Sequence, residues 1–487
     1  MLHIYNTLTL EKEKFKPLRQ EEVKVYFCWP TPYNFAHIGN LKTYIFEDYI
    51  IKSLKFLGYK VKTTMNITDI DDKTIRDSQK FWEKLLPYTQ KYTNYFLEDL
   101  QKLNVNLADN VAAISWLIDE MVEMVNWLIK KWYAYLWEDG SIYYEIKKFK
   151  RYGNLAHLDF SGMKQSVRIN NDEYDKESAA DFALWKAWKE DDGENYWEKE
   201  FVFGDEKKIL KWRPGWHIEC SACNLKYFWA QIDIHMGWVD NIFPHHQNEI
   251  AQTEAYTGKK FANYWIHGGH ITVNGKKMAK SANNFYTLRD LEEKFIWVEK
   301  KDLYRAIRLS FMNAKYRESV DFSFEKLEQN FTNIKKIDES IKKLSRIIAI
   351  GNLTEGKFRR DLREELQDFI WEYIEKLEDD FNMPEALSIF FLFITFANTH
   401  IDSGKLSAWE ANAILDMYKT FNQVLSIMIF DFIEDEIPSE ILEKFEQRNT
   451  AKQEKNFQKA DDLRNELLIL WYKIIDDRSG SRIEKIK

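Results

Sequence analysis

Residues 28–40 read Cys-Trp-Pro-Thr-Pro-Tyr-Asn-Phe-Ala-His-Ile-Gly-Asn, and this stretch decides the fold. A short β-type run, Val23–Phe27, precedes it. Apolar residues at helical spacing follow it over residues 41–57, and Gly58 can cap that helix. A further β-type run over residues 59–65 completes a β-α-β unit, which predicts an α/β fold with a parallel sheet.

The turn His37-Ile-Gly-Asn40 lies at the start of the predicted helix. A helix N-terminus offers free N–H groups and a positive dipole end, both of which suit a phosphate. Gly39 lets a ligand approach the backbone closely. The spaced glycines of the dinucleotide fingerprint are absent from this stretch, so we predict a different phosphate-binding solution. An ordinary strand-to-helix loop is the competing interpretation.

Size and composition exclude several classes of protein. The chain has 487 residues, enough for three or more domains, and its 45% hydrophobic and 30% charged residues are typical of a globular protein. No secretory signal opens the sequence, and the most apolar run, residues 389–397, is too short to span a bilayer. Three cysteines make no disulfide framework, and a net charge of −8 argues against nucleic-acid binding over the whole surface. We therefore expect a cytoplasmic protein without membrane segments.

Histidines and thiols are concentrated in one region. Six of the ten histidines lie between residues 217 and 270, and so do Cys220 and Cys223. The spacing Cys220-Ser-Ala-Cys223 is compatible with a redox pair or with half of a four-cysteine zinc site. However, the sequence has no second such pair, and no thioredoxin-like pattern surrounds this one.

A donor set from separate segments fits this region better. His245 and Glu249 are four residues apart, so a helix would place both on one face. Cys28 and one thiol of the region would complete two thiolates, an imidazole and a carboxylate, which zinc accepts. Spacing alone does not choose between the two thiols, nor between His245 and His246. Residues 66–73, with three carboxylates in four positions, could bind a metal or form a polar loop.

A lysine-rich stretch, Lys276-Lys-Met-Ala-Lys-Ser281, lies far along the chain from the His37 turn. Its ammonium groups could neutralise a triphosphate from the opposite side. Together the two stretches resemble the signature motifs of class I aminoacyl-tRNA synthetases, usually His-Ile-Gly-His and Lys-Met-Ser-Lys-Ser. The variants found here, Asn40 and Ala279, keep this chemistry.

Three further blocks are similar to those of cysteinyl-tRNA synthetases, namely residues 66–73, 212–222 and 243–252. The resemblance implies one zinc ion per chain that reads the thiol of cysteine and separates it from serine without an editing domain. The implied ligands are Cys28, Cys220, His245 and Glu249. Cys223 would then be a small buried thiol, and residues 66–73 would form a loop beside the active site.

The resemblance also implies the other site residues. Those that would bind ATP are His37, Gly39, Asn40, Lys277 and Lys280, and all of them except Gly39 would take part in catalysis by neutralising the triphosphate of Mg²⁺-ATP. Those that would bind cysteine are Cys28, Thr31, Trp216 and His235.

The resemblance covers the chain from its first residues to its last segment. It implies a Rossmann-type parallel-sheet catalytic core with a connective insertion, an α-helical bundle on the anticodon side and a small C-terminal domain. Amphipathic patterns, as in residues 362–377, support the bundle, and residues 111–136 also show a helical pattern. The expected division is 1–115, first half of the core; 116–210, insertion; 211–290, second half with the zinc site; 291–323, stem-contact junction; 324–440, bundle; and 441–487, small tRNA-binding domain.

The implied function is that of a cysteine–tRNA ligase. Cysteine would attack the α-phosphate of ATP, and the terminal ribose of tRNA(Cys) would take the cysteinyl group from the adenylate. The implied partners are tRNA(Cys), ATP and cysteine, and we expect a monomer. A ligase that joins cysteine to a small amine through the same adenylate is an alternative, although it would not need residues 324–487.

Tryptophan is unusually frequent in this chain, with 18 residues against 17 glycines. Five tryptophans stand where the resembled family usually has glycine: Trp29, Trp132, Trp229, Trp238 and Trp471. An indole in place of a hydrogen overpacks a site of close approach or demands an unfavourable backbone angle. A catalytically impaired relative that still binds zinc or tRNA is therefore a second alternative.

Overall fold

The computed structural model describes residues 1–20, 22–28, 31–106, 108–158, 168–169, 181–278, 284–351, 359–431, 438–477 and 480–485. The contacts divide the chain into two compact units. Unit 1 comprises Met1–Ile334, Ile370–Ser388 and Gln423–Ile427. Unit 2 comprises Lys335–Phe369, Ile389–Asn422 and Met428–Lys487.

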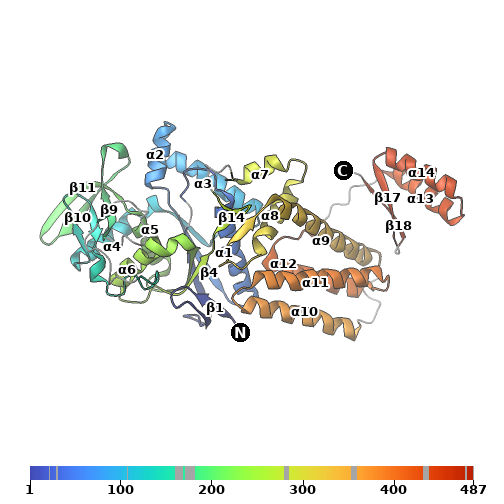
Figure 1. The fold of residues 1–487 in the computed structure, drawn as a ribbon, viewed down its shortest axis with the longest axis horizontal. Coiled ribbons are helices and arrows are strands. Elements are labelled where there is room, and N and C mark those ends of the chain that lie inside the picture. Colours follow the sequence, from blue (N-terminus) through green and yellow to red (C-terminus); the bar gives the residue numbers. More distant parts are fainter. Residues whose placement is uncertain are drawn as a thin grey trace. The chain divides into compact units, whose positions relative to one another are not determined.

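Unit 1 is built on a parallel five-stranded sheet in the order β13-β12-β3-β4-β5 (Figure 1). The strands are β3 (Val23–Phe27), β4 (Val61–Ile67), β5 (Asn110–Ala113), β12 (Ile232–Trp238) and β13 (Ala262–Gly268). Strand β3 is central, and its Val25 and Tyr26 are fully buried. A parallel sheet with helical crossovers confirms the predicted α/β class.

Helix α1 (Ile38–Phe56) connects β3 to β4 and packs on β4 and β12. The predicted helix and both predicted strands of this β-α-β unit are confirmed, with β4 beginning two residues later than expected. Gly58 follows the helix with φ of 93°, as a cap in the left-handed region requires. The first crossover of the sheet thus follows from local sequence.

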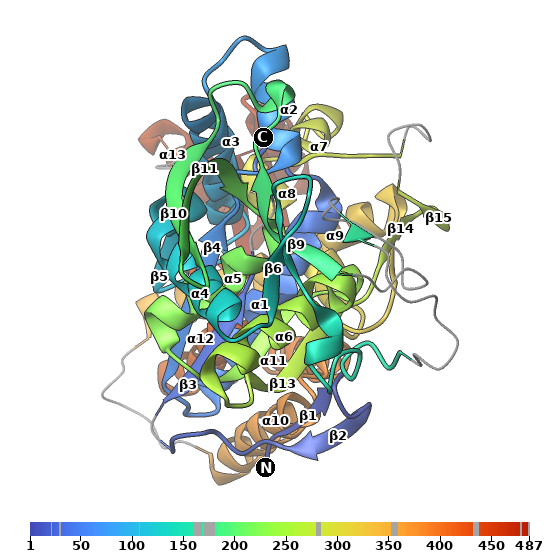
Figure 2. The ribbon, with the colours of Figure 1, turned by 90° about the vertical axis from the view of Figure 1, so that its left-hand side faces the viewer.

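A second sheet lies within the predicted insertion. Its strands pair in the order β10-β11-β9-β7-β6, with β8 added beside β9. They are β6 (Ala134–Leu136), β7 (Ile142–Tyr144), β8 (Arg168–Ile169), β9 (Asp181–Ala187), β10 (Trp197–Phe203) and β11 (Glu206–Pro214). Figure 2 shows β9, β10 and β11 facing the viewer.

The helix predicted over residues 111–136 is wrong at both ends. Helix α4 spans only Ile118–Lys130, because the preceding residues pair with β4 as strand β5 and the following ones pair with β7 as strand β6. The apolar side chains of these flanking residues have helical spacing in the sequence, but their backbone groups form hydrogen bonds with neighbouring strands.

The remaining elements of unit 1 surround the five-stranded sheet. The strands are β1 (His3–Asn6), β2 (Glu11–Lys14), β14 (Ile271–Val273), β15 (Lys276–Lys277) and β16 (Val320–Phe322). The helices are α2 (Asp72–Lys80), α3 (Leu85–Lys102), α5 (Trp216–Phe228), α6 (Gln247–Thr257), α7 (Leu288–Lys294) and α8 (Lys300–Met312). Short helical turns are η1 (Ile114–Trp116), η2 (Ile146–Lys148), η5 (Glu190–Asp192), η6 (Val239–Asn241) and η7 (Ile242–His246).

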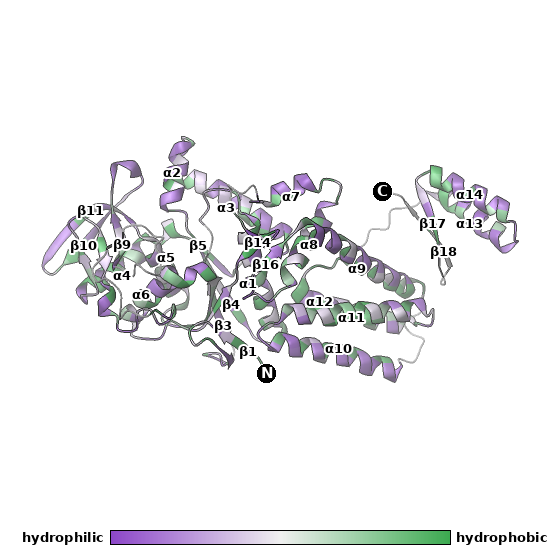
Figure 3. Ribbon diagram, viewed as in Figure 1, coloured by the Kyte–Doolittle hydropathy of each residue, from purple (hydrophilic) through white to green (hydrophobic). Residues whose placement is uncertain are grey.

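Four long helices follow β16. They are α9 (Phe324–Ile350), α10 (Arg360–Glu378), α11 (Met383–Asp402) and α12 (Ala408–Leu425). The amphipathic pattern predicted over residues 362–377 lies within α10, and hydrophilic and hydrophobic residues alternate along α9 and α10 in Figure 3. The expected helices of this region are confirmed.

Helix α11 is long and apolar enough, by length and composition alone, to cross a membrane, whereas its most apolar run was expected to be too short. In unit 2, however, Phe390 and Phe393 of this helix are fully buried. Their rings lie 5.5 and 5.1 Å from the ring of Phe421 in α12. This packing is that of a core helix in a helical bundle.

The last described segment has a small core of its own. Its elements are α13 (Ser439–Gln453), α14 (Phe457–Ile469), β17 (Tyr472–Asp477) and β18 (Gly480–Lys485). The residues that make up its core are Ile441, Leu467, Tyr472, Ile474 and Ile483. Buried Arg448 of α13 pairs with Asp476 of β17 at 2.6 Å, which ties the helices to the hairpin.

Buried Arg308 of α8 joins segments of unit 1 that are distant in the sequence. Its guanidinium pairs with Asp48 of α1 at 2.5 Å and donates to the carbonyl of Leu425 at 2.7 Å. Neither charged side chain of this pair is more than 1% exposed. Breaking a buried pair leaves an uncompensated charge, so this contact is costly to remove.

We expect the substitution Arg308→Met to lower the free energy of unfolding by about 3 kcal/mol or more. Urea denaturation followed by circular dichroism would measure the change. The matched control is Arg360→Met, because Arg360 pairs with Glu364 at 2.9 Å but is 91% exposed. An exposed pair is worth less than about 1 kcal/mol, so equal effects of the two substitutions would contradict this prediction.

Candidate functional site

The structure brings the four predicted metal ligands together from three parts of unit 1. Cys28 follows β3, Cys220 lies in α5, and His245 and Glu249 lie in η7 and α6. One donor atom from each lies within 4.8 Å of the others. The Sγ atoms of the two cysteines are 3.4 Å apart.

The imidazole and carboxylate complete the group. His245 Nε2 lies 3.3 Å from Cys220 Sγ and 3.0 Å from Glu249 Oε1. Tetrahedral zinc with bonds of about 2.3 Å to sulfur places two sulfur ligands about 3.8 Å apart, close to the separation found here. Two thiolates, an imidazole and a carboxylate in a buried site therefore fit a zinc ion.

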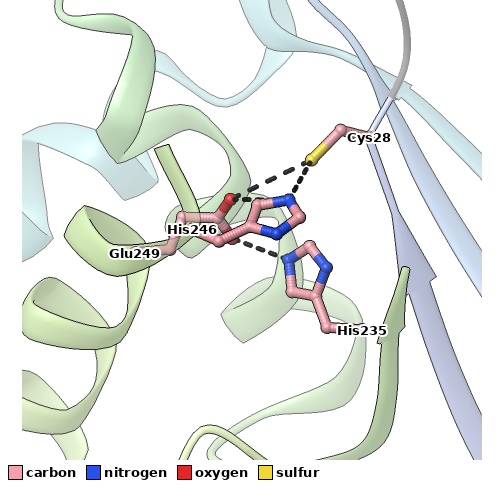
Figure 4. A group of neighbouring side chains, drawn as sticks. All are labelled: Cys28, His235, His246 and Glu249. Atoms are coloured by element: carbon pink, nitrogen blue, oxygen red, sulfur yellow. Dashed lines mark hydrogen bonds and ion pairs between the residues drawn. The ribbon is translucent and has the colours of Figure 1, made fainter. Parts of the chain in front are cut away.

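A second donor set overlaps the first. It consists of Cys28, His235, His246 and Glu249 (Figure 4). His246 Nε2 lies 3.9 Å from both Cys28 Sγ and Glu249 Oε1. Because the two sets share Cys28 and Glu249, they are alternative positions for one ion.

Further histidines orient the donor groups. His217 Nδ1 lies 3.1 Å from His245 Nδ1, on the side of the ring opposite Cys220. His235 Nε2 lies 2.8 Å from Glu249 Oε2. Such contacts from a second layer of residues fix the ring and carboxylate orientations of metal ligands.

The charges of the site favour the anionic forms of Cys220 and Glu249 and the protonated form of His245, which must lose its proton when a metal binds. Burial alone lowers the pKa of His245 and raises that of Glu249. The negative charges of Cys220 and Glu249 instead raise the pKa of His245 to about 10, and His235 and His245 lower the pKa of Glu249 to about 2. For Cys220, burial raises the pKa, but the hydrogen bond with Cys28 and the charge of His245 bring it to about 6. Glu249 and Cys220 are thus anionic at neutral pH.

The residues that the resemblance left out of the ligand set have other contacts. Cys223 is fully buried in the hydrophobic core, and burial raises the pKa of its thiol. Gln247 accepts a hydrogen bond from the N–H of Leu155 at 3.0 Å. Neither residue belongs to a donor set in the described part of the chain.

The residues expected to bind cysteine lie at different places. The Trp216 ring stacks on His245, with centroids 4.0 Å apart and 19° between the planes. Thr31 is half-buried, and its carbonyl accepts from the N–H of Tyr33 at 3.0 Å. Trp216 and His235 thus border the donor groups, whereas no contact of the Thr31 side chain with them is seen among the described residues.

The acidic stretch at residues 66–73 forms a loop beside the donor groups. The Thr68 hydroxyl donates to Glu219 at 3.0 Å, and Asn66 Oδ1 lies 3.6 Å from Cys220 Sγ. Asp71 caps α2, and Asp69 accepts from Ser115. The sequence analysis predicted this loop but did not single out Asn66 and Thr68, which contact Cys220 and Glu219. Their position between the end of a predicted strand and the acidic residues was the signal that could have identified them.

The His37 turn opens α1 as predicted, but its N–H groups are not free. His37 Nδ1 accepts from the N–H groups of Gly39 and Asn40 at 3.1 and 3.3 Å, and the N–H of Ile38 donates to the carbonyl of Tyr286 at 2.8 Å. The expectation of free amides for a phosphate is therefore wrong in this structure, because the imidazole folds back as the helix cap. A Cβ at Gly39 would come within 2.9 Å of that ring, so the cap needs glycine there.

The segment after the lysine-rich motif meets this turn. His37 forms a β-bridge with Thr287, and its ring lies 4.9 Å from that of Phe285. Lys280 and the side chain of Lys277 lie outside the described residues. The segment that follows the lysine-rich stretch therefore lies against the His37 turn.

Comparison with known proteins now defines the family. The model of the class I (C) tRNA synthetase catalytic domain matches residues 14–332, and the DALR domain matches residues 372–430. The cysteine–tRNA ligase of Brachyspira hyodysenteriae is 42% identical over 482 residues, which cover 98% of each chain. That of Protochlamydia amoebophila is 39% identical over 488 residues, covering 99% of this chain and 98% of the relative. The chain belongs to the cysteine–tRNA ligase family.

Solved structures agree with the fold of this family. The ligase is similar to Mycobacterium tuberculosis methionyl-tRNA synthetase bound to methionyl-adenylate, with a TM-score of 0.57 and 13% identity over 85% of this chain and 90% of that chain. It is also similar to a leucyl-tRNA synthetase of Agrobacterium radiobacter, with a TM-score of 0.59 and 11% identity over 85% of each chain. At these identities the likeness concerns the fold.

We expect Cys220→Ala to reduce the zinc content of this ligase from about one ion per chain to near zero after dialysis, because three donors remain of a four-donor site. Colorimetric zinc determination on the purified chain would measure this. The matched control is Cys223→Ala, a buried thiol in the same helix, which should keep the zinc content unchanged. Loss of zinc in the control, or its retention in Cys220→Ala, would contradict the ligand assignment.

Proposed function

We propose that the chain activates cysteine with Mg²⁺-ATP and transfers it to tRNA(Cys), with zinc bound by Cys28, Cys220, His245 and Glu249. Family membership gives the reaction. The observation that supports the metal assignment is the convergence of two thiols, an imidazole and a carboxylate in one group, of which only Cys28 is half-buried and the others are fully buried. Cys28 of this group follows the central strand β3, in the same segment that leads to the His37 turn.

The contacts around the donors favour this set over the one with His235 and His246. His235 already engages Glu249 Oε2, while Glu249 Oε1 faces His245. His246 Nε2 is 3.9 Å from both Cys28 Sγ and Glu249 Oε1, so this set is less compact than the set that contains His245. Two thiolates also give a softer donor set than one.

Bound there, zinc would supply a Lewis-acidic position that accepts a thiolate and binds a serine hydroxyl poorly at neutral pH. The chain's own side chains would shape the pocket for cysteine. Trp216 would form a flat apolar wall through its stack on His245, and Thr31 would provide a polar contact. His235 would border the pocket and hold Glu249 in place.

Residues of the two signature stretches would bind ATP. The positive dipole end of α1 and the His37 imidazole would face the phosphates, with Gly39 and Asn40 in the same turn. Lys277 and Lys280 would neutralise the charge that develops on the triphosphate from the other side. The bridge between His37 and Thr287 supports this arrangement, since it brings the two segments together.

The rest of the chain would serve the tRNA. The six-part division at residues 115, 210, 290, 323 and 440 assigns the insertion to the acceptor end and the bundle and last segment to the anticodon side. We propose a monomer that acts in the cytoplasm. A ligase for a small amine would have no use for the helices α9 to α14.

ATP–pyrophosphate exchange tests the proposal on the full, zinc-loaded chain. We expect exchange that depends on cysteine, none with serine, and charging of tRNA(Cys). Lys280→Ala should lower the exchange rate about 100-fold or more, because it removes a positive charge at the developing anion. Lys276→Ala, in the same lysine-rich stretch, is the matched control and should change the rate far less.

Other outcomes would separate the alternatives. Exchange with cysteine but no charging of tRNA would indicate a ligase for a small amine. Zinc binding without exchange would indicate the catalytically impaired relative. Equal exchange with cysteine and serine would contradict the role of zinc in substrate selection.

A further inference from the structure

Four tryptophans lie where the backbone is left-handed. Trp82, Trp132, Trp229 and Trp471 have φ values of 57°, 63°, 68° and 67°. Twelve described residues other than glycine have positive φ, so tryptophan supplies a third of them although it makes up 18 of 487 residues. A Cβ clashes with the backbone in this region, and the usual exceptions are small polar residues such as asparagine. Tryptophan is thus concentrated where it is least expected.

Three of these tryptophans end helices in the manner of glycine. After α4, the N–H groups of Trp132 and of the next residue donate to the carbonyls of Ile129 and Leu128, both at 2.9 Å. After α1, the N–H groups of Gly58 and of the next residue donate in the same pattern, both at 3.0 Å. This is the Schellman motif, whose left-handed residue is usually glycine.

Two further tryptophans take the same position at the ends of α2 and α14. The N–H of Trp82 donates to Gln79 at 3.0 Å after α2, and that of Trp471 donates to Leu468 at 3.1 Å after α14. Glycine takes this place after α6 and α11, with φ of 71° and 64°. Glycine and tryptophan therefore occupy the same left-handed position after different helices of this protein.

Trp229 has the least permissive backbone of the four. It follows α5 with φ of 68° and ψ of −140°. This combination borders a region that glycine alone occupies readily. The N–H of Trp229 still donates to the carbonyl of Leu225 at 3.1 Å, so the helix end is well formed.

The four indole side chains are exposed to solvent. They are 96%, 78%, 68% and 67% exposed, in chain order, and none forms a side-chain hydrogen bond or ring contact within the described part of the chain. Trp185 and Trp265, in contrast, are buried to 0% and 1% exposure, and the Trp216 ring stacks on His245. The four left-handed tryptophans thus differ from these three in that their indole rings form no hydrogen bond or ring contact among the described residues.

We infer that the cell that makes this protein inserts glycine at residues 82, 132, 229 and 471. The four left-handed residues are then encoded by UGA, a codon that different genetic codes read as stop, as tryptophan or as glycine. Buried tryptophans such as Trp185 and Trp265 are encoded by UGG. The inference rests on backbone geometry and does not depend on the proposed function.

The inference does not extend to all five positions that the resemblance singled out. Trp238 has φ of −81°, which any residue adopts, and its indole donates to Asp240 at 3.2 Å. The expectation of an unfavourable backbone angle therefore fails at residue 238 and holds at Trp132, Trp229 and Trp471. Trp29 lies outside the described residues. Trp82 is an addition that the sequence comparison missed.

The codons of the gene and the mass of the native protein test the inference directly. We expect UGA at the four positions and UGG at residues 185 and 265. Peptide mass spectrometry of the protein from its own cells should show glycine at the former positions and tryptophan at the latter. UGG at the four positions, or peptides that contain tryptophan there, would overturn the inference.

Stability measurements test its physical premise on recombinant protein. The combined variant W82G, W132G, W229G and W471G should have a melting midpoint on the order of 5 °C above that of the chain with the four tryptophans. The reason is that it removes the Cβ atom from four residues with left-handed backbone. The matched control is Trp371→Gly, since Trp371 is 63% exposed but lies inside α10. Glycine inside a helix should lower the melting midpoint by a few degrees. If the combined variant melts no higher than the chain with the four tryptophans, the premise that these residues strain the backbone is refuted.

Discussion

The structure of unit 1 depends on the burial of four metal-type donors at one point. Two thiols, an imidazole and a carboxylate meet there, from the half-buried Cys28 and the fully buried Cys220, His245 and Glu249. Buried charges are costly unless they are paired, and here His235 and His245 both pair with the Glu249 carboxylate. A metal ion would balance the remaining negative charge, which explains why the donors converge instead of avoiding one another.

The position of β3 makes this convergence useful. Because β3 lies between β12 and β4, its carboxyl end is at the centre of the parallel sheet, where open α/β sheets bind ligands. Cys28 therefore stands at the start of the segment that ends in the His37 turn, and the bridge from His37 to Thr287 brings the segment after the lysine-rich motif to the same place. The donor group and the His37 turn thus share one edge of the sheet.

The unusual tryptophans bear on folding more than on the donor groups. The left-handed ones follow α2, α4, α5 and α14, at helix ends whose indoles point to solvent. The donors themselves have close mutual distances and low exposure. We therefore expect the four left-handed tryptophans to act through strain at helix ends, away from the donor group.

The sequence by itself determined the β3–α1–β4 unit, because its hydrophobic periods and the capping Gly58 are local signals. With the family resemblance it also indicated the ligand residues. Tertiary structure decided what depends on distant partners: residues 110–113 and 134–136 became strands because β4 and β7 offer backbone hydrogen bonds. It also folded the His37 ring back over the first amides of α1 and set Tyr286 against Ile38. The choice of Cys220 over Cys223 required the orientation of α5 about its axis, which places one thiol beside Cys28 and the other in the core.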